Sequence, residues 1–385
     1  MIVLKILLRN SLRHPLRSAL TVLAVAIAIL AFGLLRTVID AWYAGVQASS
    51  AARLVTRSAI SLIVPLPLSY APRIRQVDGV AKVSWGNWFG GIYQDEKNFF
   101  PSFAVEPYGY LDLYPEMVLT AEELAAFRRE RTACIVGRKT AARFGWKLGQ
   151  TITLRGTIYP GEWPMTIRGI FRGRDKTADE SPLLFHWEYL NEGMKRTWPG
   201  TTDSVGWYLV GVKDPDRAAQ VSAAIDAMFK NSVAETLTET EKAFNLGFIS
   251  MTEAIITVIR LVSLAVIAII MVVAANTMAM TARERVREYA TLKALGFDGF
   301  RIGALVWGES LTLTAVGGAA GMLLTFPAAR YFASQLGQFF PVFNVSTTTL
   351  LLDAAAIVAV GIAASLVPTW RAATVKVVEG FRHLG

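Results

Sequence analysis

Four long apolar runs restrict the fold of this chain more than any other feature of its sequence. They occupy residues 18–40, 254–280, 302–326 and 349–368. A helix needs about 20 apolar residues to cross a hydrocarbon core of about 30 Å, and each run is long enough to do so. The first run follows basic residues, as in a signal peptide, but it exceeds the roughly 7 to 15 apolar residues of such a peptide. We therefore predict four transmembrane helices, the first of them an uncleaved anchor.

The composition agrees with a membrane protein. Of the 385 residues 53% are hydrophobic and only 18% are charged, against roughly 25% charged in ordinary soluble proteins. The net charge of +9 could suggest nucleic acid, but the basic residues mostly flank the apolar runs, so no nucleic-acid partner is expected. The single cysteine and the three scattered histidines predict no disulfide, no metal site and no catalytic group: Cys134, His14, His186 and His383.

The basic residues also predict an orientation, because short segments rich in Lys and Arg stay in the cytoplasm. They gather before the first run, between the second and third runs, and after the fourth. The predicted order is a cytoplasmic N-terminus and first span (1–40), an external domain (41–252), the second span (253–280), a cytoplasmic segment (281–301), the third span (302–326), a short external loop (327–348), the fourth span (349–368) and a cytoplasmic tail (369–385).

The external segment 41–252 is long enough to build its own hydrophobic core. Alternating strand-like runs occur at 58–68, 150–156, 164–171 and 205–212, and helix-like runs at 120–131 and 216–231. We therefore expect an α+β domain, in one or two subdomains. The flanks 41–53 and 233–253 have helix-like sequences, which favours a helical stalk continuous with the spans over plain linkers.

The segment TARERVREYATLKALGF (281–297) predicts a separate amphipathic helix. Thr281 and Glu284 fit a capping box at its start, and Gly296 suits the left-handed position after its end. About 15 residues lie between these signals, or roughly 22 Å of helix. The apolar side consists of Val286, Tyr289, Ala290, Leu292 and Leu295. Anionic lipid headgroups would account for the arginines alone, whereas a docked protein would use the apolar side and the glutamates as well.

A few polar groups lie in or near the spans. Glu309, about seven residues into the third span, is either a functional residue or a partner in a hydrogen bond within the bundle. Arg36, Arg260 and Asp353 lie near external ends, where their side chains can reach the interface. The aromatic segment 85–93 could bind an apolar substrate, but packing in a core is the favoured interpretation.

Several segments resemble those of one known family. ERVREYATLKALG (284–296) is similar to the E-R-x-R-E-x-x-x-L-K/R-A-L/I-G segment of the FtsX/MacB-like permeases of ABC transporters. Residues 136–154 with 166–171 resemble that family's periplasmic core pattern, and 368–382 resembles its tail. The glycines of the third span also resemble the family's and would let helices approach closely: Gly317, Gly318 and Gly321. The order of one span, a large domain and three spans matches throughout.

The resemblance implies a non-catalytic permease subunit in a bacterial inner membrane. Two copies, identical or paralogous, would pair with a cytoplasmic ATPase on a separate chain, contacting it through a coupling helix with the residues Arg283, Glu284, Arg287, Glu288 and Leu292, ended by Gly296. This chain has no phosphate-binding G-x-x-x-x-G-K-[ST] loop, so ATP is expected on the partner and no cofactor here. A periplasmic adaptor protein and membrane lipids are the other implied partners.

The function implied by the resemblance is export or extrusion of a substrate, driven by motion of the periplasmic domain. Two alternatives within the family are LolC/LolE-like extraction of lipoproteins and FtsX-like signalling to a cell-wall hydrolase without transport. A further alternative is a membrane-anchored sensor that has no ATPase. The proteins that accompany the chain would discriminate among these functions.

Overall fold

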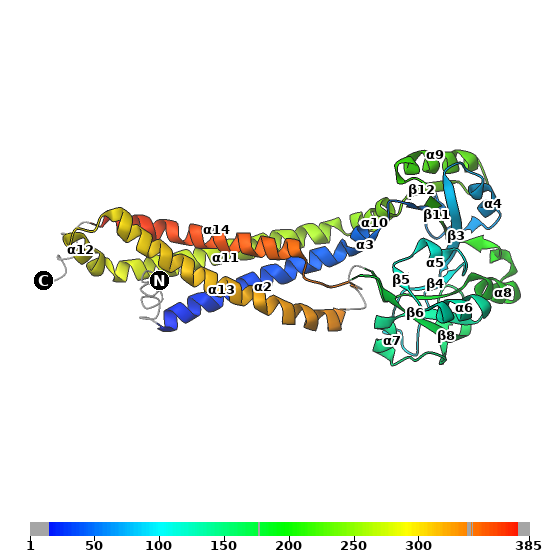
Figure 1. The fold of residues 1–385 in the computed structure, drawn as a ribbon, viewed down its shortest axis with the longest axis horizontal. Helices are drawn as coiled ribbons and strands as arrows, with labels where there is room; N and C mark the ends of the chain where they lie inside the picture. Colours follow the sequence, from blue (N-terminus) through cyan, green and yellow to red (C-terminus); the bar gives the residue numbers. More distant parts are fainter. Residues whose placement is uncertain (1–14, 176–177, 337–339, 341, 376–385) are drawn as a thin grey trace. The chain divides into compact units, whose positions relative to one another are not determined.

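We analysed a computed structural model that describes residues 15–175, 178–336, 340 and 342–375 (Figure 1). The basic residues expected before residue 15 and after residue 375 lie outside this range, as do His14 and His383. The chain divides into two compact units. The helical unit comprises Met1–Ala41, Glu253–Gln335 and Phe343–Gly385, and the α+β unit comprises Trp42–Thr252 and Leu336–Val342. This arrangement confirms the predicted fold class.

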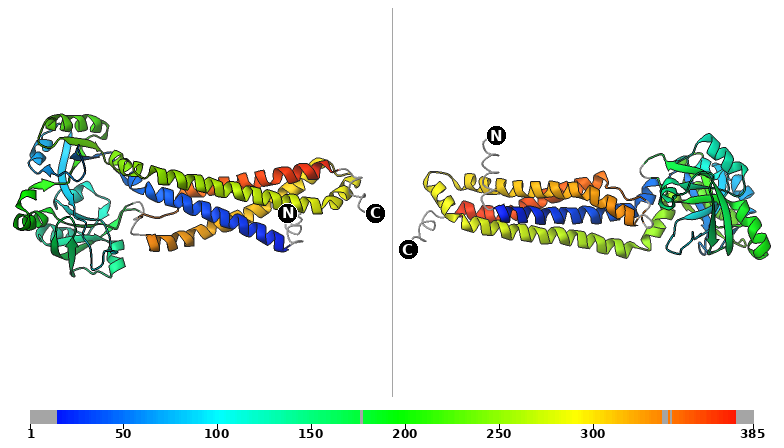
Figure 2. Two further views of the ribbon diagram at one scale, coloured as in Figure 1. Left: turned by 180° about the vertical axis from the view of Figure 1, so that it is seen from behind. Right: turned by 90° about the horizontal axis from the view of Figure 1, so that it is seen from below.

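Four long helices form the helical unit, and Figure 2 shows them side by side from two further directions. They are α2 (Pro15–Trp42), α11 (Glu253–Glu284), α13 (Gly299–Leu336) and α14 (Thr347–Thr374), with the short α12 (Val286–Ala294) between α11 and α13. Each long helix is apolar enough to cross a membrane. Pro327 and Pro368 lie inside helices, so α14 continues to Thr374, beyond the Pro368 at which the last span was predicted to end. A proline removes a single backbone hydrogen bond, which a packed span can accommodate.

Glycines bring α13 close to its neighbours. A Cβ atom at Gly317 would lie 2.7 Å from the carbonyl oxygen of Val22, and one at Gly321 only 2.4 Å from that of Ala26, so both glycines face α2. A Cβ at Gly318 would lie 2.3 Å from Ile357 of α14. Any larger side chain at these positions would therefore force the helices apart.

The α+β unit contains one large mixed sheet with the order β12-β1-β11-β3-β4-β9-β6-β8-β5, and β7 pairs with β8. Its strands are β1 (Arg53–Ser58), β3 (Val80–Trp88), β4 (Ser102–Val105), β5 (Met117–Val118), β6 (Ala133–Gly137), β7 (Thr151–Gly156), β8 (Gly161–Gly173), β9 (Leu183–His186), β11 (Trp207–Val212) and β12 (Thr236–Thr240). β2 (Leu66–Pro67) and β10 (Ser204–Val205) form a separate pair. Only the pairs β4–β9 and β6–β8 are parallel.

Helices cover this sheet and bury both of its faces. They are α3 (Ala44–Ala48), α4 (Tyr70–Arg75), α5 (Tyr110–Leu113), α6 (Ala121–Arg129), α7 (Arg138–Phe144), α8 (Trp187–Thr197), α9 (Ala218–Phe229) and α10 (Glu241–Ser250), with short 3-10 turns at Pro199–Thr201 and Pro215–Arg217. Consecutive strand residues enter different apolar clusters: Leu54 and Tyr208 in one, Val55 and Leu209 in the other. Alternation along the strands therefore gives the unit two cores.

Most predicted elements of this unit are present, and two predictions are wrong. Of residues 58–68, Ser58 ends β1 and only Leu66–Pro67 forms a further strand, β2, because Pro65 and Pro67 cannot donate to a sheet. Thr236–Thr240 is strand rather than helix, and it pairs with β1. The aromatic segment packs in the core as favoured: Phe89 is fully buried, and the Tyr93 ring contacts Phe144 and Trp146.

The helices are interrupted where the sequence predicts a continuous helical stalk. α2 ends at Trp42 before α3 begins at Ala44, and α10 ends at Ser250 before α11 begins at Glu253. The two short helices α3 and α10 do contact each other within the α+β unit. The amide of Asn245 donates to the carbonyl of Gly45 and to the hydroxyl of Ser49, at 3.3 and 2.8 Å.

Candidate coupling site

The helix in the segment 281–301 is shorter than the sequence predicts. α11 continues through Glu284, and the Thr281 hydroxyl donates to the carbonyl of Thr277 at 3.0 Å, so the predicted capping box is wrong. Thr281 cannot cap because the residues before it are already helical. α12 has nine residues, or about 14 Å of helix. Gly296 follows it with φ of +92°, the left-handed conformation predicted for that position.

Glu284 joins the end of α11 to α2. The Arg17 guanidinium donates to both carboxylate oxygens of Glu284, at 2.5 and 2.9 Å. Such a paired contact fixes orientation as well as distance. Glu284, predicted to contact the ATPase, is thus bound within its own chain.

Arg285 joins the start of α12 to α13. Its Nη1 donates to Glu309 at 2.6 Å and its Nε to Glu288 at 3.0 Å. The side chains of Arg285 and Glu309 are only 11% and 14% exposed. Burial opposes the charge of Arg285, but Glu309, Tyr289 and Glu288 together outweigh it, and the pKa of Arg285 is raised. Glu309 therefore makes a hydrogen bond within the helix bundle, which is one of the two alternatives that the sequence leaves open for it.

Lys293 joins the end of α12 to the end of α14. Its Nζ donates to the carbonyls of Ala373 and Val375 at 2.8 and 2.7 Å. These carbonyls lie at the C-terminus of α14, where a cation satisfies free acceptors. Charged contacts at Glu284, Arg285 and Lys293 thus connect the segment around α12 to three long helices.

The apolar side of α12 faces the helical unit rather than solvent. Tyr289 and Ala290 are buried, and Leu292 is half-buried against the same cluster. Burial raises the pKa of Tyr289 to about 12. The expectation that the apolar side is free for a partner is therefore wrong for these residues, because the flanking helices α11, α13 and α14 already cover them.

A different face of α12 is exposed. Arg287, Thr291 and Leu295 follow one another at intervals of four residues and so lie on one side of the helix. Leu295 is 72% exposed, and Phe300 just beyond the turn is more exposed still. Arg283, at the end of α11, is exposed as well. This face combines cationic and apolar groups.

A small cavity lined by both polar and apolar groups lies behind α12. Its volume is about 50 Å³, which is room for a few water molecules. α2, α11, α12 and α13 all line it, through residues that include Arg17, Thr281, Arg285, Tyr289 and Glu309. This end of the helical unit therefore contains polar groups inside, and its charges are paired.

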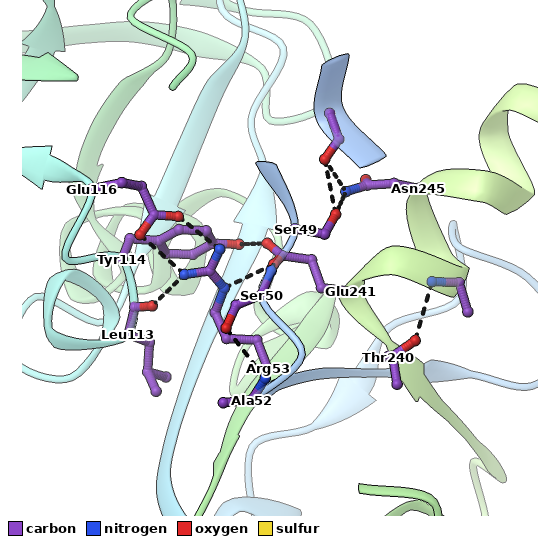
Figure 3. A network of polar contacts seen from close by, with 12 residues as sticks. Ser49, Ser50, Ala52, Arg53, Leu113, Tyr114, Glu116, Thr240, Glu241 and Asn245 are labelled. Atoms are coloured by element: carbon purple, nitrogen blue, oxygen red, sulfur yellow. Dashed lines mark hydrogen bonds and ion pairs between the residues drawn. The ribbon is translucent and has the colours of Figure 1, made fainter. Parts of the chain in front are cut away.

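A second polar network lies in the α+β unit, centred on Arg53 at the start of β1 (Figure 3). The guanidinium donates to both oxygens of Glu116 at 3.1 and 2.6 Å and to Glu241 at 2.8 Å. The Tyr114 ring lies 4.3 Å from the guanidinium carbon, and its hydroxyl donates to Glu241 at 3.0 Å. We call Arg53, Tyr114, Glu116 and Glu241 the Arg53 network.

The Arg53 network joins the two places where the chain enters and leaves this unit. Glu241 is the first residue of α10 and also accepts from the backbone N–H of Ser50 at 2.8 Å. Burial opposes the charge of Arg53, but its hydrogen bonds to Glu116 and Glu241 and the nearby negative charge together outweigh burial, so the pKa of Arg53 is raised. The entry segment, the exit helix and the segment before β5 are therefore held together by one buried cation.

Comparison with known proteins identifies the family. The FtsX-like permease C-terminal model matches residues 260–377, and the MacB-like periplasmic core domain model matches residues 18–228, more than half of the chain. The chain belongs to the FtsX/MacB-like permeases of ABC transporters. Within this FtsX/MacB-like permease, α12 lies inside the first match and the Arg53 network largely inside the second.

Individual relatives of this FtsX/MacB-like permease are distant. An uncharacterised ABC transporter permease of Methanocaldococcus jannaschii is 26% identical over 65% of this chain, and the match spans 62% of that relative's length. Among solved structures, the extracellular domain of the noncanonic ABC-type transporter YknZ from Gram-positive bacteria is 13% identical, covering 49% of this chain and all of that chain with a TM-score of 0.36. The periplasmic region of MacB from Actinobacillus actinomycetemcomitans is 10% identical, with coverages of 53% and 95% and a TM-score of 0.38.

The sequence did not reveal the partners of these charged residues. Glu309 stands out within the third span, because an ionised carboxylate in a membrane bundle requires a nearby cation. The sequence does not indicate that Arg285 is this cation. No spacing in the sequence connects Arg53 with Glu116 and Glu241. His186 has the predicted structural role: its Nε2 lies 2.6 Å from the carbonyl of Phe127, and burial lowers its pKa.

Proposed function

We propose that this permease is driven by a separate cytoplasmic ATPase that binds the segment around α12. The supporting observation is the set of charged contacts through Glu284, Arg285 and Lys293, which attach that segment to α2, α13 and α14. A displacement of α12 would carry all three helices with it. The chain itself would be non-catalytic, and nucleotide would bind the partner.

The ATPase would bind the exposed face of α12. Leu295 and Phe300 offer apolar surface, and Arg287 offers a cation beside it. Lipid headgroups would use the cation but not the exposed apolar groups at the turn. Of the residues first expected to make this contact, Arg283 and Arg287 remain candidates for it, whereas Glu284, Glu288 and Leu292 would position α12. Gly296 would end the helix.

The motion would reach the α+β unit through the continuous chain at α2 and α11. The Arg53 network supports this step, because it joins the entry and exit segments and so would make them move as one body. The proposed outcome is export or extrusion of a substrate by a pair of permease copies, with an adaptor protein outside. In the orientation that we propose, the termini and α12 would lie in the cytoplasm of a bacterial inner membrane and residues 41–252 outside it.

Co-purification tests the docking face. Changing Leu295 to Asp together with Arg287 to Ala should reduce recovery of the ATPase about tenfold, because a charge would enter the apolar contact. ATPase stimulation should fall with it. The matched control is Val233→Asp, the same type of change at a fully exposed valine of the α+β unit. Wild-type recovery and stimulation in the double variant would sink the proposal.

Thiol labelling tests the orientation. Burial raises the pKa of the Cys134 thiol and covers it, so the native protein should give almost no background. A cysteine replacing Val233 should react with an impermeant maleimide on intact cells, and one replacing Thr291 should react only after permeabilisation. The opposite pattern would reverse the proposed topology.

Isolation of the native complex tests which of the proposed functions, export, signalling, lipoprotein extraction or sensing, the permease performs. An ATPase together with an adaptor protein would support export. Recovery of a peptidoglycan hydrolase would favour signalling, and recovery of lipoproteins would favour extraction. A complex without any ATPase would contradict the proposal and favour a sensor.

A further inference from the structure

Asp353, in the second turn of α14, is fully buried in the helical unit. Neither of its carboxyl oxygens has a hydrogen-bond partner within the described part of the chain. The expectation that its side chain reaches the membrane interface is therefore wrong. Buried polar groups nearly always find partners, so this one requires an explanation.

Three helices enclose the carboxyl group. A Cβ atom on Gly33 of α2 would lie 2.9 Å from Asp353 Oδ2 and 3.0 Å from Thr325 Oγ1 of α13. One carboxyl oxygen of Asp353 and the Thr325 hydroxyl therefore occupy the space above Gly33. Thr325 is also fully buried. The absence of a side chain at Gly33 is what admits the carboxyl group to this position.

The nearby hydroxyl groups can accept a hydrogen bond but not donate one to Asp353. Thr325 donates its hydrogen to the carbonyl of Gly321 at 3.0 Å, and the buried Thr37 donates to the carbonyl of Gly33 at 2.7 Å. Each hydroxyl has one hydrogen, so only its lone pairs remain. A hydrogen bond between Thr325 and Asp353 therefore requires that the carboxyl group carry the proton.

No cation compensates a charge on Asp353 in the described residues. On α2, Arg36 lies 3.8 Å from Asp40, and Asp40 accepts from the hydroxyls of Ser346 and Thr349 at 2.5 and 2.7 Å. The remaining charged side chains near this end of α11 and α13 are Glu253, Arg260 and Arg330, and all three are exposed. An ionised, unpaired carboxylate inside a membrane bundle is strongly disfavoured.

We propose that Asp353 is a proton-binding site within the membrane-spanning helices, at the crossing of α2, α13 and α14. In this packing the carboxyl group carries a proton, and the Thr325 hydroxyl is the polar group beside it above Gly33. The proton leaves to water, and the carboxylate forms, only when these helices separate enough to hydrate the group. Proton release would therefore accompany movement of α2 against α14, whatever the partner that drives it.

Labelling with dicyclohexylcarbodiimide tests this site in the full-length protein in its membrane. The reagent dissolves in the bilayer and attacks protonated carboxyl groups, and mass spectrometry of the peptides locates the adduct. Asp353 should be modified about tenfold faster than Glu309 or Asp40, since these two lie beside arginines. Modification should fall as the pH is raised, because proton occupancy falls.

Substitution gives an independent readout. Asp353→Asn copies the shape of the neutral acid, so it should abolish labelling and keep the melting temperature close to that of the wild type. Intact protein in which Asp353 stays unlabelled at every pH, or is labelled no faster than Glu309, overturns the proposal. So does an Asp353→Asn protein that does not fold. ATPase binding plays no part in these measurements, so their failure leaves the proposed function standing.

Discussion

Two carboxyl groups buried in the helical unit have opposite surroundings. Glu309 of α13 lies 2.6 Å from Arg285, beside a cavity whose other charges are also paired. Asp353 of α14 is more deeply buried and has no partner in the described structure. Burial alone therefore does not decide whether a carboxyl group is charged; the presence of a cation does. Glu309 belongs to a fixed connection between helices, whereas Asp353 can gain or lose a proton.

The largest effect should follow from separating the pair at Glu309. Glu309→Gln removes the less exposed of the two carboxylates that pair with Arg285 and leaves only the exposed Glu288, so the free energy of unfolding should fall by about 3 kcal/mol. Thermal unfolding of the purified protein in detergent measures the change. Replacing both Glu309 and Arg285 by Met should restore much of the loss. If the double variant is as unstable as the single one, the pair is not the cause.

Substitutions in the Arg53 network should lower the free energy of unfolding somewhat less. Arg53→Met leaves Glu241 and Glu116 without their shared cation, and we expect about 2 to 3 kcal/mol of destabilisation, less than at Glu309 because Glu116 is partly exposed. Arg53→Lys keeps the charge but cannot reach both carboxylates, so its loss should be intermediate. Equal stability of the Arg53→Lys variant and the wild type would show that the two-sided contact contributes nothing.

The solvent-exposed pair Lys82–Asp112 should contribute much less to the free energy of unfolding than the two buried networks. The hydrogen bond from Lys82, helped by Arg128, holds the pKa of Asp112 below its usual value, but the carboxyl group is 43% exposed and screened by solvent. Asp112→Asn should therefore cost only about 0.5 kcal/mol at neutral pH. Because the folded-state pKa is lowered, this contribution is present above about pH 4 and is lost as the pH falls further. Melting curves at neutral and acid pH test it; a difference that persists in acid would refute the ionic origin.

The smallest effect is predicted where the carboxyl group is already neutral. Asp353→Asn makes the same exchange of carboxyl for amide as Glu309→Gln, yet the free energy of unfolding should change by less than about 0.5 kcal/mol, because no charged partner is lost. The same thermal unfolding measurement applies. Comparable losses in the two variants would remove the distinction between the two carboxyl groups.

The sequence predicted the spans and many strands, because their apolar patterns are local. The prediction of a helix start at Thr281 failed because a capping motif has this meaning only after certain preceding residues. Thr120 and Thr281 are each followed by Glu three residues later, but only Thr120 forms a capping box, with Glu123. Thr120 follows extended chain, whereas Thr281 continues a helix that began at Glu253. The motif therefore indicates a helix start only where the preceding backbone is not helical.

The charged contacts of the site were beyond sequence reasoning for a different reason. Arg17 and Glu284 are separated by 267 positions, and Arg53 and Glu241 by 188. Which carboxylate meets which guanidinium depends on how helices and strands pack, and spacing along the chain carries no such information. The same limit applies to Asp353, whose isolation is a property of three helices together.

The antiparallel pair β1–β12 has a mechanical consequence. Leu54 pairs with Thr240 and Ser58 with Thr236, so the chain enters and leaves the α+β unit at the same end of this pair. Tension that pulls α3 and α10 apart would load the two strands like a zipper, breaking one hydrogen bond after another, instead of shearing all of them at once. The contacts Arg53–Glu241 and Ser49–Asn245 lie at the end where such unzipping starts. The tension that this unit withstands is therefore decided by these few polar contacts, before either apolar core is strained.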